Sequence, residues 1–190
     1  MEQHFIDEQT FENLTFAKYE FKKGDYELCT FINCSFLDAD LSSVRFIECE
    51  FYDCNLSSAN VFQTGFQDII FKDCKLLGLD FEKCSDFAFN IKVDNCQLNH
   101  ASFYNTNLSK TVFKNCKMEG TDFTNCNLNA AVFDYCDLLN AIFFNSNLEK
   151  TDFRTAKNFS IDPENNRMQG ARFSLPSVVG LLSKYKILID

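Results

Sequence analysis

The feature that most constrains this chain is a large apolar residue at every fifth position. The series runs from Ile6 through Phe11 to Phe81, slips by two residues, resumes at Val93 and ends at Phe153. It contains 29 such centres, of which 16 are Phe and eight are Leu. A period of five fits neither an α-helix nor a single strand. It does fit a short extended piece followed by a turn, so all-β structure is expected.

A second position of the unit, two residues before each centre, holds small side chains. All ten cysteines fall in this register, and Ala39, Ala59 and Thr121 occupy it elsewhere. Free cysteine behaves as a small buried hydrophobe. The other three positions are polar and rich in Asn and Asp, which suit turns. We therefore expect two inward side chains per unit and ten buried, reduced cysteines, instead of metal ligands or disulfides.

The cysteine spacing predicts the size of one coil. Three cysteines before the slip lie 20 residues apart, three after it also lie 20 apart, and 22 residues separate the two sets. Four five-residue units per coil explain this spacing, with coils about 4.8 Å apart. One interior column is therefore expected, formed by Cys34, Cys54, Cys74, Cys96, Cys116 and Cys136. Parallel side chains at that separation do not give the dihedral angle of a disulfide.

This pattern resembles the pentapeptide-repeat family. The family unit is a small residue, Asp or Asn, Leu or Phe, a polar residue and any residue, as in 121–125 (TDFTN) and 59–63 (ANVFQ). The resemblance covers about residues 6–157 and implies a right-handed quadrilateral β-helix, a solenoid of stacked coils. We expect this domain to span residues 1–157, interrupted near 85–93. There Phe87, Phe89, Ile91 and Val93 alternate, which predicts a short strand or a bulged coil.

Residues 158–190 are expected to form a cap and a dimerisation segment. Pro176 marks the start of a predicted short helix, and residues 187–189 are expected to form a strand. A solenoid needs its open end covered, so a cap alone is one interpretation. A self-complementary interface between two protomers is the other, and we favour it because the segment is so apolar. Its expected residues are Val178, Val179, Leu181, Leu182, Tyr185, Ile187, Leu188 and Ile189.

The residues that carry chemistry do not form a recognisable active site. The two histidines, His4 and His100, have no triad or metal-ligand spacing to a cysteine, and the six glycines form no phosphate loop. We therefore predict no enzymatic activity and no catalytic, cofactor-binding or metal-binding residues. The beginning of the chain does not read as a signal peptide, and no apolar run reaches the roughly 18 residues of a membrane span. A cytoplasmic protein without membrane contact is expected.

The charge pattern excludes direct nucleic-acid binding and favours a basic protein partner. The formal net charge is −9, whereas phosphate binding needs clusters of Lys and Arg. Residues 1–86 hold 17 acidic and 7 basic residues, a net charge of −10, and residues 87–153 hold 7 and 5, a net charge of −2. The acidity therefore lies mainly in the first half of the repeats.

Within the pentapeptide-repeat family, the chain looks most like the subset that contains the Qnr quinolone-resistance proteins and the MfpA type. The shared features are the interruption between two blocks of repeats and the apolar segment 175–189. This resemblance implies a homodimeric DNA mimic that binds DNA gyrase or topoisomerase IV and modulates quinolone sensitivity. The alternative is a structural or scaffolding rod that binds another protein partner.

Overall fold

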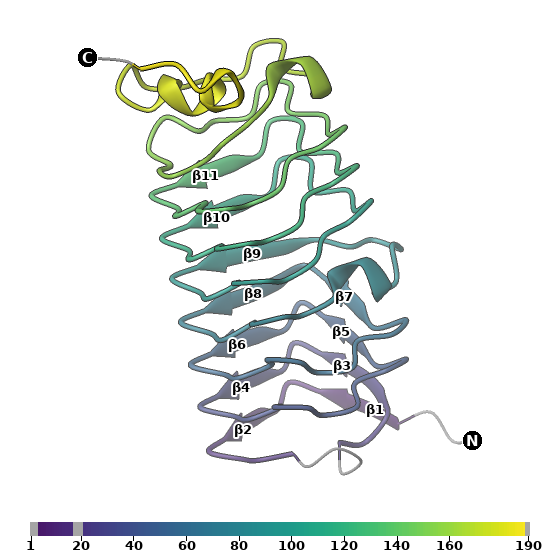
Figure 1. Cartoon of the computed structure of the whole chain (residues 1–190). Coiled ribbons are helices and arrows are strands. Elements are labelled where there is room, and N and C mark those ends of the chain that lie inside the picture. The colour runs from purple at the N-terminus through teal and green to yellow at the C-terminus, as the bar shows by residue number, and fades with distance from the viewer. Residues whose placement is uncertain (1–3, 17–20, 189–190) are drawn as a thin grey trace.

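The chain folds into a four-sided rod of stacked coils. The computed structural model describes residues 4–16 and 21–188. Figure 1 shows the coils stacked along one axis, with the two ends of the chain at opposite ends of the rod. All strand pairs are parallel. They join residues 20 apart, such as Phe31 with Phe51, except across the slip, where Phe71 pairs with Val93. The right-handed quadrilateral β-helix expected from the sequence is confirmed.

Two of the four sides carry regular sheets. One sheet has the order β1-β3-β5-β7 and the other has the order β11-β10-β9-β8-β6-β4-β2. The strands of the first are His4–Asp7, Gly24–Glu27, Arg45–Ile47 and Gly65–Gln67. Those of the second, from β2 to β11, are Thr10–Glu12, Thr30–Ile32, Glu50–Tyr52, Ile69–Lys72, Ile91–Asp94, Val112–Lys114 and Val132–Asp134. The other two sides are built from isolated parallel bridges, such as Ser35 with Asn55 and Asp40 with Asn60.

The core is a set of aromatic stacks that run along the rod. Phe31 and Phe51 lie 4.8 Å apart between ring centroids with an angle of 11° between the rings. Phe113 and Phe133 repeat this arrangement at 5.2 Å and 14°. Because the coil spacing nearly equals the thickness of stacked rings, phenylalanine fills the interior without gaps. This explains the high Phe content.

The corners of the rod require left-handed backbone. The residue two positions after most centres has a positive φ, as in Asn33 (50°), Asp53 (52°), Asp73 (58°) and Asn95 (55°). Asn and Asp tolerate this region better than most residues. The backbone conformation at the corners therefore explains why the polar positions of the repeat are rich in Asn and Asp.

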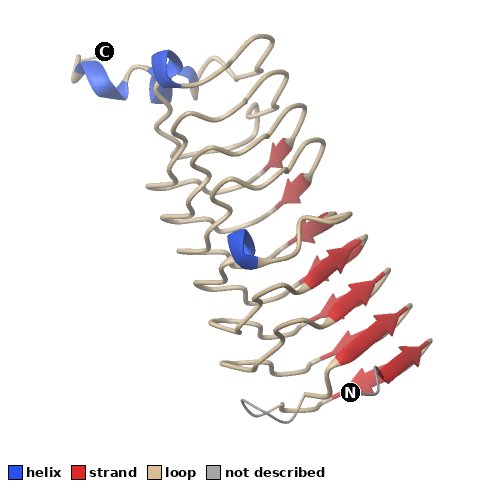
Figure 2. Ribbon diagram, turned by 90° about the vertical axis from the view of Figure 1, so that its right-hand side faces the viewer, coloured by secondary structure: helices blue, strands red, loops and turns tan. Residues whose placement is uncertain are grey.

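Of the two structures predicted for residues 85–93, a short strand or a bulged coil, the interruption forms the bulged coil, with a strand only from Ile91. A short 3-10 helix, η1 (Phe81–Lys83), comes first and is the helix near the middle of the rod in Figure 2. The following strand begins only at Ile91. Phe89 packs partly against the core, but Phe87 is 71% exposed. The predicted alternation therefore holds from residue 89 onward and is wrong at Phe87, where the inserted residues form a bulge.

The C-terminal segment also differs from the prediction. Parallel bridging continues past residue 157, to Asp152 with Arg172, and a turn of 3-10 helix, η2 (Pro163–Asn165), lies in that last coil. The predicted helix is two 3-10 turns, η3 (Val178–Leu181) and η4 (Ser183–Tyr185). Residues 187 and 188 form no strand, and Ile189 lies outside the described residues. In the described part of the chain no further coil stacks on this segment, so residues 187 and 188 have no strand with which to pair.

Candidate functional site

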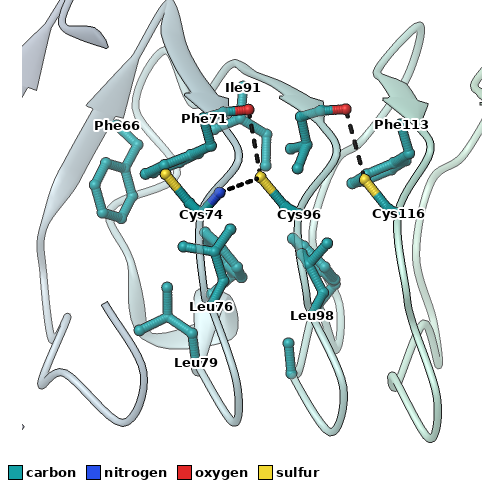
Figure 3. Close-up of a cluster of buried hydrophobic side chains, with 14 of the residues drawn as sticks. Phe66, Phe71, Cys74, Leu76, Leu79, Ile91, Cys96, Leu98, Phe113 and Cys116 are labelled. Carbon is teal, nitrogen blue, oxygen red and sulfur yellow. Dashed lines mark hydrogen bonds between the residues drawn. The ribbon is translucent and has the colours of Figure 1, made fainter. Parts of the chain in front are cut away.

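The structure places the six column cysteines inside the rod, one above another. Figure 3 shows Cys74, Cys96 and Cys116 in successive coils. Each thiol donates to a backbone carbonyl in the coil before it, as Cys74 does to Phe51 (3.3 Å between Sγ and O). The amide of Cys74 donates in turn to Sγ of Cys96 at 3.3 Å. The column therefore contributes hydrogen bonds between coils, and its thiols are closed off from solvent.

Cys84 departs from the expectation that all ten cysteines are buried. All ten are free, but Cys84 is half-buried, whereas the other nine are buried. The residue two positions later is Asp86 instead of an apolar centre, so the chain leaves the core at this point. Burial suppresses thiol ionisation at Cys84 as well and raises its pKa, and it raises the pKa of Cys49 and of Cys126 to about 12. The buried thiols are therefore unreactive structural groups.

The outer surface is where a partner can bind, and its charge is uneven. In the C-terminal half, several acidic side chains lie next to basic ones: Glu149 pairs with Arg167 at 2.7 Å, and Asp152 with Arg154 at 2.7 Å. In the N-terminal half, Asp40 pairs with Lys23 at 2.9 Å, and Asp25 and Asp80 also have basic partners. Most of the other carboxylates among the described residues of this half form no ion pair.

Two corners of the N-terminal coils carry these uncompensated carboxylates. Glu48 and Asp68 lie one coil apart at one corner, and Asp53 and Asp73 lie one coil apart at the next. Within the described residues, none of the four has an ion pair. We define them as the acidic corners. Stacked like charges along a rod produce an extended negative potential, which attracts a basic surface.

The C-terminal segment divides into inward and outward residues. Leu181 packs against the core, Val178 is partly buried, and the Ile161 amide donates to the Gly180 carbonyl at 3.1 Å. These contacts close the end of the rod. The remaining apolar residues face outward and are exposed: Leu175, Val179, Leu182, Tyr185, Ile187 and Leu188. The predicted interface list thus mixes capping residues with a free apolar patch.

One surface feature was missed by the sequence reasoning. A hollow of about 850 Å³ opens beside the interruption, between residues 82–89 and Tyr104–Asn107. The sequence signal that could have found it is Cys84, which lacks an apolar centre after it, together with the two-residue slip. Elsewhere in the described part of the chain, no group of three metal-ligating residues exists and no helix is long and apolar enough to cross a membrane.

Comparison with known families decides which class of solenoid this is. A family model described as a pentapeptide repeat region matches residues 24–90 and 86–173. The chain is a pentapeptide-repeat protein. No curated protein matches this pentapeptide-repeat protein by sequence.

Solved structures agree with this fold. A trypsin-treated form of QnrB1, described as a plasmid-mediated fluoroquinolone resistance protein, has a TM-score of 0.64 at 19% identity, covering 98% of this chain and 100% of the QnrB1 chain. Full-length QnrB1 has a TM-score of 0.52 at 20% identity, with 98% and 100% covered. HetL from the cyanobacterium Nostoc sp. strain PCC 7120 gives 0.35 at 13% identity, with 90% and 87% covered. At these identities the likeness to QnrB1 shows the fold alone.

Proposed function

We propose that this pentapeptide-repeat protein is a non-enzymatic rod that mimics DNA and binds a type II topoisomerase. The observation that carries the proposal is the row of uncompensated carboxylates at the acidic corners of a rigid rod. Enzymes that grip duplex DNA present basic surfaces, because they neutralise phosphates. A rod with regularly spaced carboxylates offers such a surface a charge pattern similar to that of a phosphate backbone.

The likeness to QnrB1 supports this assignment through shape. QnrB1 is described as a fluoroquinolone resistance protein, and its full length overlaps this chain. A topoisomerase partner, DNA gyrase or topoisomerase IV, would make this protein a modulator of quinolone sensitivity. It would act in the cytoplasm, where those enzymes work, without contacting DNA or membranes.

The second part of the proposal is a homodimer formed by the C-terminal patch. A dimer joined there would double the length of the rod about a two-fold axis. Leu182, Tyr185, Ile187 and Leu188 lie outward at the end of the rod, where a second copy could cover them. Apolar residues gathered at one end of an otherwise polar surface are typical of interaction sites.

Titration into a DNA gyrase supercoiling assay, with and without a fluoroquinolone, tests the assignment. We expect inhibition of supercoiling or relief of the drug effect by the wild-type protein. The double variant Glu48→Gln with Asp68→Asn should weaken the effect, since it removes two charges from the acidic corners. The matched control, Glu119→Gln with Asp134→Asn, removes two charges from the C-terminal half. Equal loss in both variants would exclude the acidic corners as the contact.

The alternative is a scaffolding rod that binds a different protein. The position of the acidity favours it, because the acidic corners lie far from the C-terminal patch, where a dimeric DNA mimic would have its centre. Supercoiling that is unchanged at a large excess of folded, dimeric protein would favour this alternative.

A further inference from the structure

The hydrogen-bond ladder of the rod is broken on one side of the interruption. The sheet β1-β3-β5-β7 ends at β7, whereas the other sheet continues to β11. Among the described residues, no backbone hydrogen bond joins 82–90 to 104–109. The two coils stay together elsewhere, because β8 pairs with β9 and the rings of Phe81 and Phe103 stack at 4.5 Å. The break is therefore local to one corner.

Comparison with the next coils identifies the backbone groups that the break leaves open. The Asn127 amide donates to the Thr106 carbonyl at 3.1 Å, and the Asn147 amide donates to the Cys126 carbonyl at 2.9 Å. Asn107 occupies the same position one coil earlier, and within the described residues its amide has no such backbone partner. The Tyr104 carbonyl likewise receives no backbone amide from the coil below. It accepts the Thr106 hydroxyl at 3.4 Å.

The side-chain ladder stops at the same place. The Asn147 amide group donates to Oδ1 of Asn127 at 3.1 Å, and that of Asn127 donates to Oδ1 of Asn107 at 3.0 Å. No further acceptor for Nδ2 of Asn107 exists in the described part of the molecule. The underside of this coil is therefore a short unpaired edge at Asn107, which bridges to Asn127 on its other side, and the open Tyr104 carbonyl lies in the adjoining turn.

The hollow under this edge is large enough for a short length of chain and has an acidic wall. Its volume is about 850 Å³, and residues 82–86 form its lower wall. Lys83 is already paired with Asp80, and Glu82 accepts a hydrogen bond from the Ser102 hydroxyl at 2.9 Å. Among the residues that line the hollow, Glu82 and Asp86 are therefore the charges without an ion pair. The exposed ring of Tyr104 lies on the opposite wall. Carboxylates opposite an aromatic ring suit an Arg or Lys side chain.

We call this hollow with its open edge the slot. We propose that the slot binds an extended, basic segment of a partner protein by strand addition below Tyr104–Asn107. Backbone hydrogen bonds to the open edge would give affinity, and Glu82 and Asp86 would select basic side chains. The proposal rests on the proposed protein-binding function. It does not depend on the partner being a topoisomerase, and the slot lies apart from the acidic corners.

A fluorescein-labelled heptapeptide of alternating arginine and threonine tests the slot by fluorescence anisotropy. We expect saturable binding to the full chain, and at least tenfold weaker binding of the same peptide with glutamate in place of arginine. Glu82→Gln with Asp86→Asn should also weaken binding at least tenfold. The control Glu119→Gln with Asp134→Asn removes the same charge away from both the hollow and the acidic corners, and it should leave binding within about twofold.

Experiments on the backbone amide of Asn107 distinguish strand addition from simple charge attraction. Asn107→Pro removes an amide hydrogen that no other backbone group uses, together with the side chain that accepts from Asn127 and from the Ser109 amide. Asn107→Ala loses the same side chain and keeps the amide hydrogen, so it is the matched control. Peptide binding should be at least tenfold weaker for Asn107→Pro than for Asn107→Ala. In hydrogen exchange of the wild-type protein, the Asn107 amide should become protected when peptide is added. Unchanged binding by Asn107→Pro, equal binding of the acidic peptide, or no protection at Asn107 would each overturn the proposal. The slot variants should keep any gyrase effect, so the two proposals fail independently.

Discussion

At the residue scale, the small inward position is decided by size, and where cysteine, threonine or serine occupies it the side chain in most cases also donates a hydrogen bond. Thr64 and Thr121 occupy the position that cysteines hold elsewhere, and their hydroxyls donate to the carbonyls of Leu41 (2.8 Å) and Leu98 (2.9 Å) one coil earlier. Cys126 makes the same contact with Phe103. A small donor satisfies a carbonyl that faces the interior, where an unpaired acceptor would be costly. Cysteine is thus used as a buried donor.

The burial of the thiols predicts slow modification. At pH 8, native labelling of the cysteines should be slow, because burial excludes the reagent and keeps the pKa of groups such as Cys49 near 12. Cys84 should react first, since it is half-buried. Mass spectrometry after timed labelling measures this order, and denaturation should expose all ten thiols. Rapid native labelling of several column cysteines would contradict the structure.

The stacked rings predict a large difference between core and corner substitutions. Phe113→Ala should lower the free energy of unfolding by about 3–5 kcal/mol, because it leaves a cavity between coils. Asn105→Ala should cost roughly 1–2 kcal/mol, since alanine fits the positive φ of 57° less well. Urea denaturation measures both, and Asn105→Gly serves as a control that should be close to wild type. Equal losses of unfolding free energy in the core and corner variants would refute the assignment of Phe113 to the interior and of Asn105 to a corner.

At the scale of elements, the parallel ladders hold the coils and the 3-10 segment closes the end. Lys184 lies 2.7 Å from Asp162 and 2.6 Å from Glu164, and the Tyr185 hydroxyl donates to Glu164 at 3.1 Å. Gly180 lies so close to Phe159 that an added Cβ would come within 2.4 Å of its carbonyl oxygen. The segment is therefore fastened by one ion-pair cluster and one close backbone contact.

The ion-pair cluster predicts that the cap loosens in acid. Hydrogen bonds from Lys184 lower the pKa of Asp162 and of Glu164. A lowered pKa in the folded state stabilises docking above the ordinary carboxyl pKa of about 4, and this contribution is lost as the pH falls through the lowered values. Hydrogen exchange at the Ile161 amide, corrected for intrinsic rates, should show less protection at pH 3 than at pH 7.

The matched control is Lys184→Met, which removes the cation and keeps much of the side-chain bulk. Its Ile161 protection should be low at both pH values. Pronounced acid loosening in this variant would assign the effect to carboxylates other than Asp162 and Glu164.

At the scale of the whole molecule, the rod has two different ends. The N-terminal coils carry the acidic corners, and the C-terminal end carries the apolar patch and compensated charges. A rod of this kind can bind a basic partner along its side while a second copy covers its end. The two surfaces do not overlap, so their functions can be separated by mutation.

The apolar patch predicts a dimer that a single charge should disrupt. Leu182→Asp would place a carboxylate in a desolvated interface, which is unfavourable without a partner. We expect a dimer for the wild type and a folded monomer for the variant in light scattering, with unchanged circular dichroism. Phe62→Asp is the control, since Phe62 is exposed on the side of the rod, and it should remain dimeric. A monomeric wild type at high micromolar concentration would leave the segment as a cap alone.

The architecture could be predicted from the five-residue repeat alone, because the repeat is local and each unit shows its inward and outward positions directly. The centres, the small donors and the corner residues recur in register, so four units per coil and the column from Cys34 to Cys136 follow from spacing. The exposed Phe87, the 3-10 cap and the slot at Asn107 were decided by tertiary structure. They depend on which coil lies above or below a segment, where the repeat no longer fixes the neighbour. Tertiary structure also decided which carboxylates form ion pairs and which, at the acidic corners, do not. Ion pairs join residues on different coils through side chains that the five-residue pattern leaves unconstrained.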